Sequence, residues 1–173
     1  PKRMAESFVR PTLSATPGDL SLVMPKRILD GIIETVAVHY ESHFGSAAHV
    51  GPIPASLEEF TEATLARLNF TVHDPVIRKI RRLLTLEQYR NDRIRDQMTL
   101  HNYTGTRDLY TVIFTGMMEK GLLKQGDPSL LAFEFTAPVT VLIQLLDREP
   151  DREEEVMTLI HRHIDHFLSL YSA

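Results

Sequence analysis

Residues 128–146 read PSLLAFEFTAPVTVLIQLL, and this stretch decides the fold. Its apolar side chains occupy most of the circumference of a helix, which predicts a helix buried on more than one side. The Asp-Pro pair at its start is a common N-cap followed by a first-turn proline. Its apolar run from Leu130 to Leu146 carries Glu134, Pro138 and Gln144 and falls short of the roughly 20 residues that a membrane span requires. We therefore expect a core helix in a soluble protein with no membrane partner.

Helical periodicity also dominates on the N-terminal and C-terminal sides of this stretch, and no segment alternates with a period of two. The chain has 173 residues, about one domain. We predict an all-α helical bundle. The sequence leaves open whether the fourth of its helices is broken near Asn91. The apolar repeats and helix-start signals place these helices over residues 25–44, 56–68, 75–84, 86–103, 106–120, 128–146 and 151–171.

The composition excludes several classes of chemistry. The chain contains no cysteine, so disulfides, thiolate metal sites and cysteine nucleophiles are absent. The lack of cysteine fits a reducing compartment, and no signal-peptide pattern is present, so we expect a cytoplasmic protein. Residues 1–27 hold five basic against two acidic side chains, whereas the whole chain carries −4. This asymmetry suits an end that touches nucleic acid, although chance explains it equally well.

No motif for catalysis stands out. The sequence has neither a Gly-x-Ser-x-Gly nucleophile pattern nor a glycine-rich phosphate loop, so we expect no enzyme and no cofactor. His39 and His43 lie one turn apart, and His161, His163 and His166 cluster near the C-terminus. Zinc needs further ligands, so helix-surface and packing roles are favoured over a metal site. A bundle enzyme with a histidine-bound metal is the third alternative for the function.

Five segments in order resemble the regulatory half of TetR/AcrR-type transcriptional regulators. Each is weak alone, but their order and spacing are moderately specific. They are LTLEQYR at 84–90, MMEKGLL at 117–123, GDPSLLA at 126–132, FTAP at 135–138 and HIDHFL at 163–168. The resemblance covers residues 25–173 and implies a TetR-like ligand-binding and dimerisation domain.

In that family an N-terminal helix-turn-helix domain reads operator DNA. Residues 22–29 are similar to the end of that domain, and the resemblance implies that Lys26 contacts a phosphate. Residues 1–24 do not read as two helices and a turn. We expect them to be a remnant of the DNA-binding domain, with either part of it outside this sequence or a degraded version present. The first is favoured because the sequence starts at Pro1.

The resemblance also implies a homodimer that responds to a small-molecule effector. Ligand binding would shift the population toward a subunit arrangement that misaligns the two DNA-binding domains. The middle helices are rich in aromatic and thioether side chains, which favours an apolar pocket, with simple core packing as the alternative. The expected lining residues are Phe60, Met98, His101, Tyr110 and Phe114.

The last two helices carry more apolar surface than one protomer can cover. We expect them to pair with their two-fold mates in a four-helix bundle. The expected interface residues are Phe135, Leu142, Leu159, His163 and Phe167. The leading hypothesis is a ligand-released repressor; the alternative is a stand-alone helical small-molecule-binding or dimerisation module without DNA binding.

Overall fold

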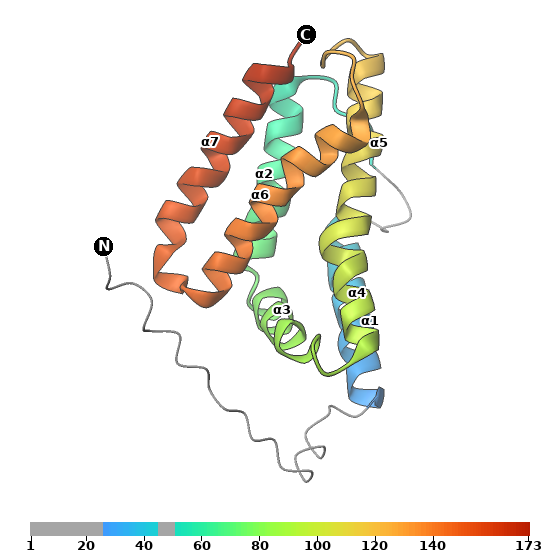
Figure 1. The fold of residues 1–173 in the computed structure, drawn as a ribbon, viewed down its shortest axis with the longest axis vertical. Helices are drawn as coiled ribbons and strands as arrows, with labels where there is room; N and C mark the ends of the chain where they lie inside the picture. Colours follow the sequence, from blue (N-terminus) through green and yellow to red (C-terminus); the bar gives the residue numbers. More distant parts are fainter. Residues whose placement is uncertain (1–25, 45–50) are drawn as a thin grey trace, which may run out of the picture.

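The computed structural model describes residues 26–44 and 51–173, in which helices follow one another through short connections (Figure 1). Within these ranges no strand forms, and one isolated bridge joins Leu123 to Ser172. The prediction of an all-α fold is therefore confirmed, whereas the expected DNA-binding remnant at 1–24 lies outside the described residues. The elements are α1 (Lys26–Phe44), α2 (Leu57–His73), α3 (Pro75–Glu87), α4 (Asp92–Thr99), the π-helix η2 (Leu100–Gly105), α5 (Thr106–Glu119), α6 (Pro128–Arg148), the 3-10 helix η3 (Pro150–Arg152) and α7 (Glu153–Tyr171).

Side-chain caps begin four of the helices. The Asp127 carboxylate accepts hydrogen bonds from the backbone N–H groups of Ser129 and Leu130 at the start of α6. Ser56 and Asp74 cap α2 and α3 in the same way. Asn91 caps α4, so the fourth predicted helix is indeed broken there. Each cap satisfies N–H groups that have no partner inside the helix.

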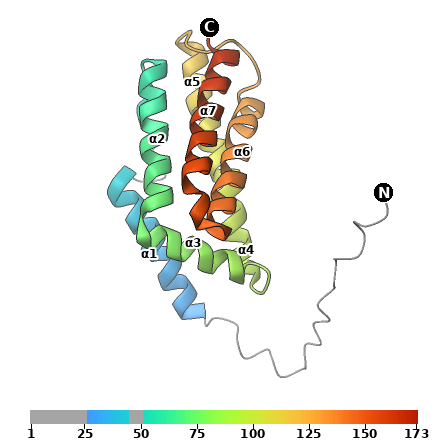
Figure 2. The ribbon, with the colours of Figure 1, turned by 90° about the vertical axis from the view of Figure 1, so that its left-hand side faces the viewer.

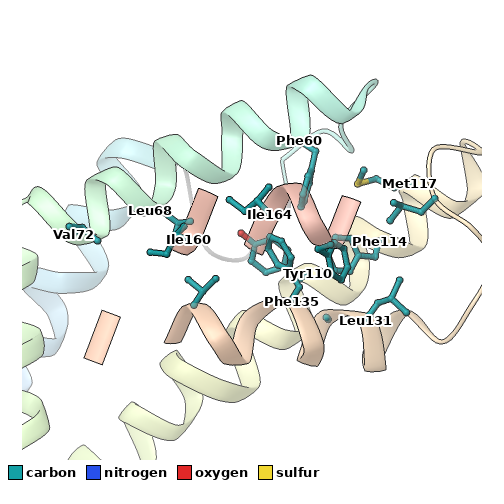
Figure 3. Packing of buried hydrophobic residues seen from close by; sticks show 14 of the residues in the cluster. Phe60, Leu68, Val72, Tyr110, Phe114, Met117, Leu131, Phe135, Ile160 and Ile164 are labelled. Carbon is teal, nitrogen blue, oxygen red and sulfur yellow. The ribbon is translucent and has the colours of Figure 1, made fainter. Parts of the chain in front are cut away.

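Four helices run along the long axis of the molecule and enclose the main core. Figures 1 and 2 show α2, α5, α6 and α7 side by side, with α3 crossing one end. Phe135 of α6 lies at the centre, with ring centroids 5.5 Å from Phe60, 5.5 Å from Phe114 and 4.9 Å from Phe167 (Figure 3). These tilted and edge-on arrangements are those that aromatic rings prefer in packed interiors.

Helix α6 is longer than the sequence pattern predicted. It has 21 residues because the helix continues through Asp147 and Arg148, so by length and composition it could cross a membrane. That criterion is weak, because a core helix of this length satisfies it as well. One face of α6 is in fact built into the core, where Phe135 and Leu146 are fully buried.

A nearly buried ion pair fastens the C-terminal end of α6 to α2 and α3. Arg81 donates from Nε and Nη2 to the two carboxylate oxygens of Asp147, each at 2.6 Å. Its Nη1 donates to the Thr71 carbonyl, also at 2.6 Å. The two charged side chains are only 12% and 11% exposed. A bidentate pair of this kind fixes both position and orientation.

We predict that Asp147→Ala lowers the free energy of unfolding by about 3 kcal/mol, because it leaves the Arg81 charge nearly buried without its carboxylate. Urea unfolding would measure the change. Asp165→Ala is the matched control, since Asp165 is an exposed carboxylate on α7, and its effect should stay within about 0.5 kcal/mol. Equal effects of the two substitutions would contradict the role assigned to this pair.

Candidate functional site

A groove of about 480 Å³ runs between α6 and the helix formed by α4 and η2. Its volume lies within the range of about 300–1,000 Å³ that is usual for small-molecule sites. One wall comes from α6, through Phe133, Thr136, Ala137, Thr140, Val141 and Gln144. The opposite wall comes from Met98, Thr99, Asn102 and Tyr103, with Gln88 beyond the end of α3.

The polar groups of the groove are amides and hydroxyls. The Thr136 hydroxyl donates to the Ala132 carbonyl, and the Thr140 hydroxyl donates to the Thr136 carbonyl. Each hydroxyl therefore donates its proton to a carbonyl of α6, and the lone pairs of its oxygen stay available to accept a hydrogen bond. Thr136, Thr140 and Gln144 follow one another at four-residue spacing, so they form a polar line along an otherwise apolar helix.

An aromatic pair, Tyr103 and Phe133, lies at one end of the groove. The rings of Tyr103 and Phe133 meet edge-to-face with centroids 6.4 Å apart, and the Arg107 guanidinium lies 5.3 Å from the centre of the Tyr103 ring. Both aromatic side chains are about half exposed, at 49% and 45%. This end therefore offers accessible flat apolar surface, whereas the opposite end offers the amides of Gln88 and Gln144.

The π-helix η2 supplies part of this wall. The sequence pattern predicted one helix ending near Tyr103 and another beginning at Thr106, but the structure joins them without interruption. Gly105 allows the joint: a Cβ there would lie 2.8 Å from the Leu100 carbonyl oxygen, a backbone atom that cannot easily move. A π segment adds a residue to the turn and shifts the helix faces, and such segments occur frequently at functional sites.

Met98 lies between the groove and the buried cluster against which α1 packs. Its side chain is 7% exposed and belongs to a second, smaller buried cluster with Leu84 and Ile94. Ile32 of α1 packs against this cluster. Met98 thus contributes both to the groove wall and to the cluster against which α1 packs. An ion pair between Arg93 of α4 and Asp30 of α1 also joins these two helices.

A second attachment of α1 lies at the junction of α2 and α3. His39 Nε2 is 3.0 Å from the Asp74 carboxylate, which also accepts hydrogen bonds from the N–H groups of Val76 and Ile77. Burial on its own raises the pKa of Asp74, but the hydrogen bonds from His39 and the two backbone groups outweigh it. The pKa of Asp74 therefore lies below its ordinary value of 3.8.

The residues predicted to line a pocket are divided between the core and the groove. Phe60, Tyr110 and Phe114 pack against one another in the core, with ring centroids 5.7–6.3 Å apart (Figure 3). Burial raises the pKa of the Tyr110 hydroxyl, which is hydrogen-bonded to Thr64. Met98 lines the groove, and the side chain of His101 lies outside the described part of the structure. Ligand contact by these five residues stays a prediction.

The predicted dimer residues are also divided. Phe135 and Phe167 lie inside the core of one chain, and His163 Nε2 donates to the Phe135 carbonyl at 2.9 Å, which joins α7 to α6. Leu142 is half-buried and Leu159 is exposed. The other exposed apolar side chains on these two helices are Leu130, Phe133, Val141 and Leu170.

Sequence reasoning missed Asn102 and Gln144, whose side chains line the groove. The Thr136, Thr140 and Gln144 repeat was a visible signal, since a polar side chain every fourth residue marks one side of an apolar helix. Lys26 begins α1, but its side chain lies outside the described residues. Within residues 26–44 and 51–173, no group of three or more histidine, aspartate or glutamate side chains could hold a metal ion.

Comparisons with known proteins identify no relative: no family model, curated protein or solved structure matches the chain.

We predict that Asp74 makes the protein sensitive to acid. Because its folded-state pKa is lowered, its contribution to stability is fully present above about pH 5 and is lost as the pH falls below 3.8 through the folded value. Wild type should therefore exceed Asp74→Asn in unfolding free energy near neutral pH, and the difference should shrink toward pH 3. Urea unfolding at a series of pH values, with Asp165→Asn as control, measures it. A difference that is constant or grows in acid would contradict the assignment.

Proposed function

We propose that this chain is the ligand-binding and dimerisation part of a TetR-type transcriptional regulator, a repressor released from its operator by a small, largely apolar ligand. The observation that carries the proposal is the position of Met98. Its side chain lines the groove and also belongs to the buried cluster against which α1 packs. A regulator of this type needs a mechanical connection between its ligand and the helix that leads to its DNA-binding domain, and Met98 supplies a direct one.

The proposed mechanism is a population shift. A ligand in the groove presses on Met98 or lets it move, and the packing of Ile32 on the small cluster changes with it. The ion pair of Arg93 with Asp30 and the contact of His39 with Asp74 hold α1 at two further points, so α1 tilts as a rigid rod. The ligand binds better to the tilt that misaligns the two DNA-binding domains, and it thereby lowers the affinity for DNA.

The exposed apolar side of α6 supports the homodimer. Leu130, Phe133 and Val141 lie on this side at three- to eight-residue spacing and are 45–59% exposed. Phe133 and Val141 also line the groove, so the proposed dimer contact adjoins the groove. Patches of this kind mark interaction surfaces more often than free surface. A second copy of the same helix would cover them in a self-complementary contact. The dimer is therefore proposed to form through the outer side of α6, with exposed Leu159 and Leu170 of α7 beside it.

The DNA-binding prediction concerns the complete gene product. Used to select sequences from a random pool of double-stranded DNA, it should enrich a palindromic site, because the half-sites must match the two-fold axis of the dimer. Residues 1–173 alone should bind that site weakly or not at all. Failure to enrich any site, together with an intact dimer that binds ligand, would favour the stand-alone module instead.

The dimer prediction uses two exposed valines of similar exposure. Val141→Asp should convert the dimer to a monomer, because it buries an unpaired charge between the two copies of α6. Val112→Asp should leave the dimer intact, since Val112 is an exposed residue of α5, a helix that the proposed interface does not include. Sedimentation at micromolar concentration distinguishes the states. A wild-type monomer, or a dimer that survives Val141→Asp, would refute this interface.

A further inference from the structure

We infer that the groove between α6 and the α4–η2 helix binds an uncharged, planar molecule that carries hydrogen-bond donors and acceptors on its edges. This inference rests on the proposed function only for its effect on DNA, because binding itself requires neither DNA nor a partner. It narrows the ligand from a largely apolar molecule to a flat, neutral one with both donors and acceptors.

Charge is the first argument. None of the described side chains that line the groove is ionised at neutral pH. A carboxylate or ammonium ligand would therefore lose its hydration without finding an opposite charge, which is unfavourable. Arg107, whose guanidinium lies over the Tyr103 ring, is already paired with Asp108 at 3.0 Å.

The spacing of the polar atoms is the second argument. Thr136, Thr140 and Gln144 lie on successive turns of α6, about 6 Å apart along the helix. The two threonine oxygens have lone pairs to accept from a ligand, since their protons are held by α6 carbonyls. The amide of Asn102, on the opposite wall, can both donate and accept. A ligand with both donors and acceptors along its length would satisfy this set.

Shape is the third argument. The Tyr103 and Phe133 rings form an accessible apolar surface at one end, suited to contact with a flat aromatic ring. Ala137 lies midway along the α6 wall, where its small side chain leaves the groove open. The groove therefore combines an aromatic end with a polar line, which a fused ring system with edge carbonyl and N–H groups matches.

The test uses three fluorescent probes of nearly identical shape: neutral acridone, cationic 9-aminoacridine and anionic acridine-9-carboxylate. Titrated against the full chain, acridone should bind saturably with one site per chain and at least about tenfold more tightly than either charged analogue. Ala137→Trp should abolish acridone binding by filling the groove, and Val112→Trp on α5 should not. No saturable binding of acridone, equal affinity for a charged analogue, or retained binding in Ala137→Trp would overturn the inference.

A second variant guards against a folding defect in Ala137→Trp. Asn102→Asp preserves shape and introduces one negative charge, so it should weaken acridone and reverse the preference toward 9-aminoacridine. Unchanged preferences in Asn102→Asp would also overturn the inference. A chain that binds acridone as described but whose complete gene product selects no DNA site would contradict the proposed function and leave this binding site standing.

Discussion

The absence of charge along α6 is the constraint on which the rest of the structure depends. Between Glu134 and Asp147 this helix has no charged side chain, so almost its whole surface has to be covered. The core covers one side through Phe135. The charged groups at the two ends are engaged: Glu134 accepts a hydrogen bond from the Tyr171 hydroxyl at 2.6 Å, and Asp147 holds Arg81. What is left is one exposed side of α6, part of which lines the groove, and the proposed ligand and second copy are assigned to adjoining parts of it that share Phe133 and Val141.

The groove depends on a local departure from α-helical geometry. Met98 of α4 belongs to the small cluster beneath α1, and Asn102 and Tyr103 of the π segment η2, which follows directly, line the groove along α6. Gly105 makes this possible because it has no Cβ to meet the Leu100 carbonyl. One short segment thus places a binding wall and a contact to α1 within a single turn or two, which is the arrangement that coupling between two sites requires.

Local chemistry made the helices predictable from the sequence, whereas the groove depends on tertiary packing. Asp74, Asn91 and Asp127 mark helix starts through hydrogen bonds within three residues, so the boundaries followed from nearby side chains. Periodicity indicated that Phe60, Tyr110 and Phe114 face inward, but it could not say whether protein or ligand fills the space beside them; the structure places them in the core. The π segment has no capping or proline signal, so it was not predicted, and with it the role of Asn102 was missed.

The central claim is that the groove and α1 are coupled within a dimer. The chain has no cysteine, so Val38→Cys, at an exposed position on α1, accepts a single spin label. Pulsed electron–electron double resonance on this variant should show one distance between spin labels, and a distance requires two labelled copies. Addition of acridone should shift that distance. A dimer whose label-to-label distance is unchanged at saturating acridone, or a sample with no dipolar signal, would contradict the account.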